Sequence, residues 1–325
     1  MKQANQKNSQ KLPARGKGQE KKSDIYTRVT NKIIADLEQG KLTWQKPWDA
    51  QHLIGRIVKP LRHNGIPYQG INVILLWAAS AEKGYTSNLW LTYRQALALG
   101  AHVREGSRGE MITYANKMTK QEEITDEAGT WQTLDREVYF MKGYTVFNVE
   151  QIEGLPAHYS LKPDPLLPDI RREDALETFF ASTKVTIRHG GDKACYNHDR
   201  DFVQMPPLEY FRNAESYYAI LAHEITHWTC HPSRLDRDFG RKRWGDKGYA
   251  REELVAELRS AFLCAELGIT PETRPDHAAY IDIWLRVLKN DKRAIFSAAA
   301  HAQRAVNYLL SLQPKQAHRE GQMIA

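Results

Sequence analysis

The chain has 325 residues, of which 42% are hydrophobic and 26% charged, and its formal net charge is +7. Two ordinary domains fit this length, and the composition excludes a wholly disordered chain. The longest apolar run, residues 71–79, is far too short to cross a bilayer, so we expect no membrane partner. The N-terminus lacks the apolar stretch of a secretory signal. Three widely spaced cysteines, Cys195, Cys230 and Cys264, suggest no disulfide framework and favour a cytoplasmic protein.

Residues 1–23 are predicted to form a flexible basic tail. Seven lysines and arginines against one acidic residue, Glu20, give this segment +6, nearly the whole excess of positive charge. A segment so poor in apolar residues does not bury enough surface to fold. Its charge fits a polyanion such as nucleic acid, and a merely solubilising tail explains it equally well.

Residues 24–155 are predicted to form a first domain of α+β class. Ser23 is a suitable N-cap for an amphipathic helix that Gly40 ends. The further elements expected are helices over 72–81 and 93–99, strands over 110–116 and 137–149, and a polar hairpin loop over 120–135.

A proline-rich segment, residues 156–170, follows and is predicted to be a stiff, extended linker, since proline removes backbone donors and disfavours helix. Residues 171–315 are then expected to form a mostly helical domain with a small sheet, and residues 316–325 a loose tail. The elements expected are helices over 173–182, 214–230, 251–267, 277–289 and 293–312, and short strands over 185–189 and 202–205. The fold class is therefore α+β in two domains.

The strongest chemical signal is the run His223-Glu224-Ile225-Thr226-His227 within the predicted helix 214–230. Two histidines four residues apart project from one helix face about one turn apart, so both can bind one ion. Glu224 lies beside them as the candidate catalytic residue, where it can take a proton from a water that Zn²⁺ acidifies to a pKa of about 7. The motif predicts a zinc site, with another divalent transition metal as the alternative. Two histidines satisfied within a helical core are the alternative explanation, which the rarity of the motif and its helical context disfavour.

A third metal ligand must come from another segment. His231 continues the spacing, but three ligands on one straight helix span roughly 12 Å, and Pro232 ends the helix there. Glu253 and Glu257 share one face of an otherwise apolar helix, where carboxylates are costly unless paired or metal-bound. We expect Glu253 to bind the metal and Glu257 to hydrogen-bond a ligand histidine, with the reverse order left open. Ion pairs with neighbouring arginines are the structural alternative.

Aromatic side chains in the first domain are set among basic ones. Single-stranded nucleic acid is held by such pairings, with bases stacked on rings and phosphates bound by lysine and arginine. Tryptophan and tyrosine also pack in cores, so composition leaves both explanations open. The candidate nucleic-acid-binding residues are Trp44, Lys46, Trp48, Arg62, Tyr68, Trp90, Tyr93, Arg94 and Arg104.

Several segments of the chain are long and unusual enough to compare with a known family. In the first domain they are Trp44-Gln45-Lys46-Pro47-Trp48, Tyr68-Gln69-Gly70-Ile71-Asn72, Trp90-Leu91-Thr92-Tyr93-Arg94-Gln95-Ala96 and Tyr144-Thr145-Val146-Phe147-Asn148-Val149-Glu150-Gln151. These segments resemble the N-terminal domain of ArdC-type antirestriction proteins, a domain also found at the front of some conjugal primases. Residues 223–228, 234–237 and 249–263 resemble that family's zincin-like metallopeptidase domain.

The resemblance implies a domain that binds single-stranded DNA joined to a metal-binding domain. It also implies a role in protecting incoming plasmid DNA from host restriction during conjugation. One departure from the family pattern is Cys230, where glycine is expected, and a side chain there can alter the turn after the metal helix.

Three functions remain to be separated. The leading hypothesis is a single-stranded DNA-binding antirestriction protein with a metallopeptidase-like domain. In the alternative, the chain is an active zinc metallopeptidase that its DNA-binding domain directs to restriction enzymes or other DNA-bound proteins. A third hypothesis makes the metal purely structural. Glu224 separates them, since a structural site needs no general base and closes its fourth position with protein.

Overall fold

The computed structural model describes residues 24–42, 44, 58–125, 131–160, 169–240, 247–269 and 277–314. The predicted basic tail, most of the predicted linker, the predicted C-terminal tail, and Lys46 and Trp48 lie outside these residues. No helix within the described ranges has both the length and the apolar character needed to cross a membrane.

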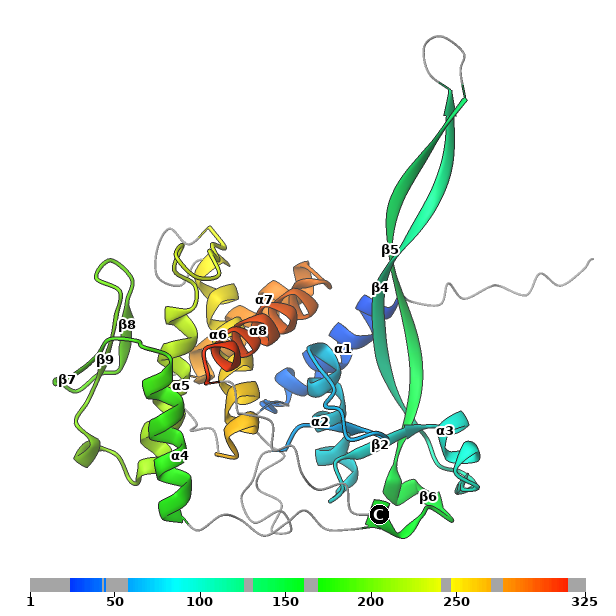
Figure 1. Ribbon diagram of the computed structural model, residues 1–325, viewed down its shortest axis with the longest axis horizontal. Coiled ribbons are helices and arrows are strands. Elements are labelled where there is room, and N and C mark those ends of the chain that lie inside the picture. The colour runs from blue at the N-terminus through cyan, green and yellow to red at the C-terminus, as the bar shows by residue number, and fades with distance from the viewer. Residues whose placement is uncertain are drawn as a thin grey trace, which may run out of the picture.

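The N-terminal part is an α+β assembly around a four-stranded sheet of order β1-β2-β5-β4 (Figure 1). The bounds are α1 Ile25–Glu38, β1 Leu61–Arg62, α2 Ile71–Lys83, β2 Leu89–Thr92, α3 Tyr93–Ala98, β3 His102–Val103, β4 Glu110–Thr125, β5 Trp131–Asn148 and β6 Ile152–Glu153. Asp24 caps α1 by accepting a hydrogen bond from the Thr27 amide at 2.8 Å, so the helix begins after Asp24 and the expected N-cap, Ser23, is wrong by one residue. A left-handed glycine, Gly84, ends α2.

Strands β4 and β5 form a ribbon much longer than the sequence predicted. They contain 16 and 18 residues and pair in register from Glu110–Val146 to Thr125–Trp131, so most of the expected loop 120–135 is strand. The ribbon projects away from the body of the molecule (Figure 1). Because neither face of its outer part is covered, its sequence lacks the alternation of apolar and polar residues that normally reveals a strand.

The C-terminal part is mostly helical with a small three-stranded sheet of order β7-β9-β8, as the sequence predicted. The bounds are α4 Asp169–Ser182, β7 Ile187–His189, β8 Cys195–Asn197, β9 Phe202–Met205, α5 Ala214–Trp228, α6 Lys247–Leu267, α7 His277–Asn290 and α8 Ala294–Ser311. Helix α6 packs against α5 on one side and against α7 and α8 on the others. The expected α+β fold with two domains is confirmed, the second being the more helical.

The two parts of the chain share one continuous core. Trp44 meets Trp284 edge-to-face at 5.9 Å between ring centroids, and Trp77 meets Phe262 at 5.8 Å. All four belong to a single cluster of buried apolar residues that extends from α1 to α8. The start of the predicted linker is also folded: Ala157–Ser160 form a 3-10 turn that buries a tyrosine.

Candidate functional site

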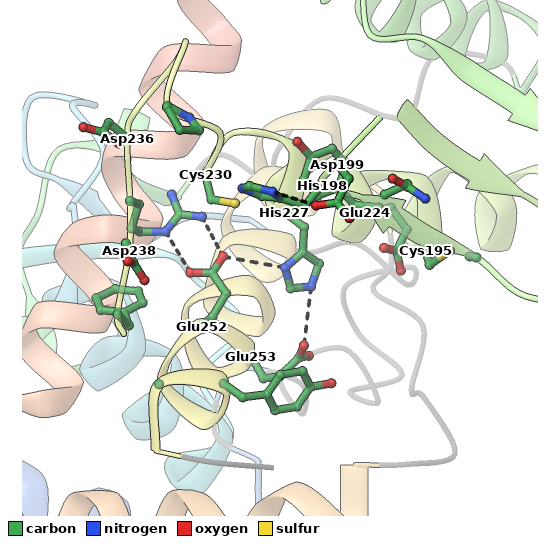
Figure 2. Close-up of a pocket in the computed structure, with 18 residues that line it drawn as sticks. Cys195, His198, Asp199, Glu224, His227, Cys230, Asp236, Asp238, Glu252 and Glu253 are labelled. Carbon is green, nitrogen blue, oxygen red and sulfur yellow. Dashed lines mark hydrogen bonds and ion pairs between the residues drawn. The ribbon is translucent and has the colours of Figure 1, made fainter. Parts of the chain in front are cut away.

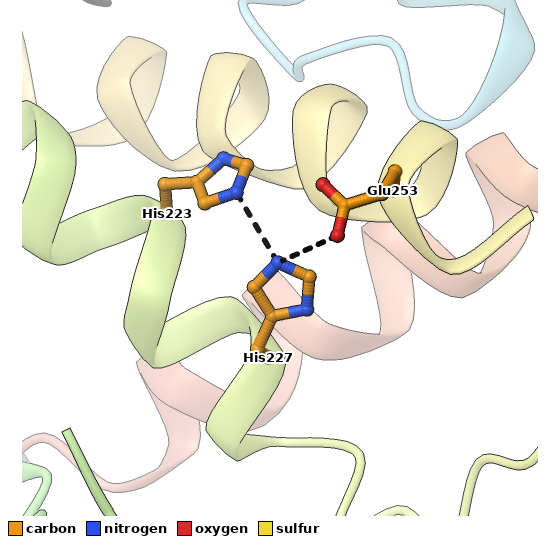
Figure 3. A group of neighbouring side chains, drawn as sticks. All are labelled: His223, His227 and Glu253. Atoms are coloured by element: carbon orange, nitrogen blue, oxygen red, sulfur yellow. Dashed lines mark hydrogen bonds and ion pairs between the residues drawn. The ribbon is translucent and has the colours of Figure 1, made fainter. Parts of the chain in front are cut away.

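Helix α5 brings three chemically active side chains to one place. Asn213 caps the helix by accepting a hydrogen bond from the Ser216 amide at 2.8 Å. About three to four turns later come His223, Glu224 and His227, and the two histidines face α6. His223 and Glu224 are buried, at 3% and 5% exposure. The Nε2 atoms of the two histidines approach to 3.2 Å (Figure 3).

Helix α6 supplies the third donor. Glu253 Oε1 lies 3.8 Å from His227 Nε2, and one donor atom from each of His223, His227 and Glu253 falls within 4.8 Å of the others. Two nitrogens that bind one tetrahedral ion at the usual zinc distance are separated by about 3.4 Å, close to the spacing seen here. The donor set of two imidazoles and one carboxylate therefore fits a divalent transition metal.

Two further carboxylates of α6 stand behind the histidines. Glu257 Oε1 is 3.6 Å from His223 Nδ1, and Glu252 Oε1 is 3.6 Å from His227 Nδ1. A carboxylate at Nδ1 fixes the ring so that Nε2 faces the cluster. Glu253 thus lies with the two Nε2 atoms, and Glu257 lies behind His223. This is the first of the two orders considered for these glutamates from the sequence. Glu252 was missed, because it is one residue off the helix face that Glu253 and Glu257 share.

Glu252 is the centre of a buried ionic network. Arg237 donates to it from Nε at 2.9 Å and from Nη2 at 2.7 Å, and Arg259 donates at 3.1 Å. Burial alone would raise the pKa of the Glu252 carboxyl, but the hydrogen bonds from Arg237 and His227 and the charge of Arg259 hold that pKa well below its usual range. Burial lowers the pKa of Arg259 to about 9. Glu252 is therefore a fixed anion behind His227.

The loop after α5 is held in place by Arg234. Arg234 donates to the Trp228 carbonyl at 2.6 Å, pairs with Asp201 and stacks over the Trp228 ring at 4.0 Å. Arg234 and Arg237 belong to one of the segments that resemble the known family, and their contacts explain why that segment has two arginines three residues apart. His231, which the sequence argument set aside as a ligand, lies outside the donor cluster and contacts Ser233 Oγ at 2.8 Å.

A cavity of about 870 Å³ opens beside the cluster. It is lined by β8 and the turn after it, by the loop 230–239 and by α5 and α6, with Glu224, His227 and Glu253 in its wall (Figure 2). Strand β8 is at the edge of its sheet, since it pairs with β9 alone among the described strands. An extended chain entering the cavity would meet β8, while β9 is enclosed on both sides.

The candidate nucleic-acid-binding residues divide into two groups. Trp44 and Trp90 have no exposed surface and Tyr68 is 6% exposed, so their rings offer no face to a base. These three are core residues, and their assignment to a stacking surface is wrong for this structure. The side chains that do face solvent are Arg62, Tyr93, Arg94 and Arg104. Composition could not separate the groups, because a tryptophan among basic residues is equally typical of a core beside a charged surface.

Comparison with known proteins identifies both halves of the chain. Residues 23–147 match the family model described as the N-terminal domain of anti-restriction factor ArdC, and residues 174–301 match a zincin-like metallopeptidase model. The metal-free crystal structure of antirestriction ArdC protein from the R388 plasmid superposes with a TM-score of 0.72 at 44% identity, and the match covers 89% of this chain and 98% of that one. The chain belongs to the ArdC family of antirestriction proteins.

Other members and relatives extend this result. The Mn(II)-bound structure of the R388 ArdC protein matches with a TM-score of 0.71 at 43% identity, over the same shares of the two chains. An uncharacterized Sinorhizobium fredii protein, y4eC, is 40% identical over 308 residues, 90% of this chain and 93% of that protein. The Escherichia coli DNA primase TraC is 37% identical over 316 residues, and this chain spans only 28% of its length.

Cys230, the departure from the expected ArdC pattern, fits its turn without strain. The described non-glycine residues with positive φ are Lys184, Asp201 and Asp236, so Cys230 does not require glycine. Its side chain lines the cavity beside the donor cluster (Figure 2). Burial raises the pKa of its thiol, which keeps it protonated and weakly reactive near neutral pH.

Proposed function

We propose that this ArdC-family chain binds single-stranded DNA through its N-terminal domain and protects incoming plasmid DNA from restriction during conjugation. The match to the ArdC N-terminal domain and the shared region with DNA primase TraC support a DNA partner. In this proposal the C-terminal domain is a zinc-dependent peptidase that acts in the cytoplasm alongside the bound strand. The observation that carries the peptidase is the buried donor cluster beside Glu224 and the open cavity.

His223, His227 and Glu253 would hold the metal. Zinc is proposed because two imidazoles and a carboxylate form a common catalytic zinc set, and the Mn(II)-bound structure of the R388 protein makes manganese the competing choice. When bound, such an ion acts as a Lewis acid and makes water a stronger acid. Glu257 and Glu252, each 3.6 Å from an Nδ1 atom, orient the two imidazoles so that Nε2 faces the cluster.

Glu224 is proposed as the general base and acid. Its carboxylate follows His223 directly on α5 and lines the cavity, where a peptide carbonyl and a water molecule would meet. It accepts a proton from the attacking water and returns it to the nitrogen of the leaving amine, so that charge is balanced at each step. A purely structural metal site would have no use for a carboxylate in this position or for an open wall.

The proposed substrate is an extended peptide segment. The free edge of β8 presents backbone N–H and C=O groups along the cavity wall, and an extended chain can add to such an edge as a further strand. The peptide bond would then lie over Glu224 and His227. Host restriction enzymes or other proteins on the same DNA are the proposed substrates, in keeping with an antirestriction role.

Replacement of Glu224 tests the proposal most directly. We expect Glu224→Gln to keep its metal content and its affinity for single-stranded DNA but to cleave a mixed peptide library at least about 100-fold more slowly, because general acid–base catalysis contributes that much or more. Protection of plasmid DNA transferred into a restricting recipient should fall with it. Glu209→Gln, at an exposed carboxylate before α5, is the matched control. Retained metal with undiminished protection would refute the catalytic role.

A further inference from the structure

The β4–β5 ribbon has two chemically different faces. Because side chains alternate along a strand, even-numbered residues of both strands share one face and odd-numbered residues share the other, as the register Tyr114–Lys142 and Lys117–Tyr139 requires. We define the aromatic–basic face by its even-numbered members Tyr114, Lys120, Arg136, Phe140, Lys142 and Tyr144. We define the opposite face by the odd-numbered members Lys117, Trp131, Asp135, Glu137 and Tyr139.

On the aromatic–basic face the rings form a connected row. Tyr114 lies 6.3 Å from Phe140 and 6.2 Å from Tyr144 between ring centroids. Lys142 Nζ sits 5.2 Å from the Phe140 centroid. Tyr114 and Tyr144 are 47% and 45% exposed, so part of each ring faces solvent.

Charge distinguishes the two faces. The aromatic–basic face carries Lys120, Arg136 and Lys142. Glu122 offsets one of these charges through an ion pair with Arg136 at 3.4 Å, and Glu110, at the end of this face nearest the body, pairs with Lys83 at 2.6 Å. The opposite face has one lysine, which is paired with Glu137, and a second carboxylate at Asp135. An anionic ligand is therefore favoured on one face and disfavoured on the other.

We propose that the aromatic–basic face of the ribbon is a binding surface for single-stranded DNA. The proposal rests on the single-strand binding proposed above and assigns it to a surface outside the initial candidates. Bases stack on Tyr114, Phe140 and Tyr144, while Lys142 and Lys120 bind phosphates, the combination that proteins use to hold single strands without sequence preference. Tyr114 on β4 lies between Phe140 and Tyr144 of β5, with ring centroids 6.3 and 6.2 Å apart, so the three rings form one surface for bases.

A second copy of the chain is the competing occupant. The centre of an interface between copies is normally depleted of charged residues, and lysine above all is rare there. Here Lys142 lies between Phe140 and Tyr144 on β5, and Lys120 and Arg136 extend the same face, which suits a ligand that presents both bases and phosphates. The basic charge therefore favours DNA over self-association.

Two double variants of the same chemistry on opposite faces provide the test. Tyr114 and Lys142 are a directly paired tyrosine and lysine on the aromatic–basic face, and Lys117 and Tyr139 are the same pair on the opposite face. Tyr114→Thr with Lys142→Gln is compared with Tyr139→Thr with Lys117→Gln, since threonine keeps strand propensity. The probe is a fluorescein-labelled oligothymidylate, with anisotropy measured between about 50 and 200 mM salt.

We expect the first variant to bind at least about tenfold more weakly than wild type, and its slope of log affinity against log salt to fall by about 0.7 for the lost phosphate contact. The second variant should stay within about twofold of wild type. Circular dichroism and metal content should be unchanged in both, which separates binding from folding.

The outcomes separate this proposal from the function on which it rests. If wild-type protein shows no salt-dependent binding, single-strand binding itself fails. If wild type binds and both variants bind equally well, or both lose binding equally, the assignment to one face is overturned alone. A change of mass from dimer to monomer in the first variant, with unchanged DNA affinity, would identify the face as a contact between copies and also overturn it.

Discussion

At the scale of single residues, the two carboxylates behind the metal-site histidines have different surroundings. Glu257 lies beside His223, whereas Glu252 lies beside His227 and also forms ion pairs with Arg237 and Arg259. The side chain of Arg259 is fully buried, and that of Arg237 is 2% exposed. Removing the anion would leave two guanidinium groups inside the protein with their partner gone.

We therefore expect Glu252→Gln and Glu257→Gln to weaken metal binding alike but to differ in stability. Loss of either supporting carboxylate should lower metal affinity about 10- to 100-fold. In metal-free protein, Glu252→Gln should also lower the free energy of unfolding by about 3–5 kcal/mol, and Glu257→Gln by less than about 1.5 kcal/mol. Urea unfolding and competition with a metal-binding dye measure the two quantities. Equal stability of the two variants would contradict the assigned network.

The sequence revealed the candidate metal donors more completely than the carboxylates that orient the histidines. His223 and His227 are visible from helical spacing, and Glu253 follows because a carboxylate on an apolar helix face needs a partner. Glu252 could not be found in this way, since its role depends on where the loop after α5 returns Arg237. Trp44 and Trp90 were candidates for base stacking but are buried, because a sequence shows which residues are aromatic but not which are covered.

At the scale of elements, the side-chain amide of Asn72 on α2 anchors the base of the ribbon. Strand β4 is an edge strand of its sheet, and the backbone of Thr113 turns away from β5. Asn72 on α2 accepts from the Thr113 amide at 2.8 Å and donates to the Thr113 carbonyl at 2.7 Å, as a neighbouring strand would. The ribbon thus leaves the body at Thr113, where Asn72 of α2 completes the hydrogen bonds of the strand backbone.

Removal of this amide should destabilise the protein. Asn72→Ala leaves the buried N–H and C=O of Thr113 without these partners, so we expect the free energy of unfolding to fall by about 1–3 kcal/mol. Asn116→Ala is the control, since Asn116 is an exposed asparagine farther along the same strand and should change stability by no more than about 0.5 kcal/mol. Urea denaturation compares them. A cost as large at Asn116 as at Asn72 would show that the ribbon is not anchored at Thr113.

Among the elements, the β4–β5 ribbon is the one whose length the sequence patterns predicted least well. Helix α1 buries one face, and its apolar spacing reveals that face in the sequence. Residues 117–125 and 131–137 gain their partners from each other rather than from a core, so polar residues such as Lys120 and Asp135 occur in strand positions without penalty. The cross-strand pairing, which shows the two faces, exists only in the folded chain.

At the scale of the whole molecule, the N-terminal and C-terminal regions are not independent bodies. Besides the tryptophan contacts, Thr30 Oγ1 donates to the Lys292 carbonyl at 2.6 Å, and buried Lys59 pairs with Glu266 at the end of α6. Helix α6 therefore carries Glu253 toward the metal site and Phe262 and Glu266 toward the N-terminal domain. Any ligand that stabilises α6 acts on a core that both regions share.

Metal binding should therefore stabilise the N-terminal region as much as the C-terminal one. At a free zinc concentration of about 100 times the dissociation constant, linkage predicts about 2.7 kcal/mol for the cooperative unit. We expect hydrogen exchange of the slowest amides in α2 to slow by the same factor as in α6, because these amides exchange through global unfolding of one shared core. His227→Ala is the control in which zinc changes neither helix. Slower exchange in α6 alone would show that the two regions unfold separately, and that metal binding has no thermodynamic influence on the N-terminal region.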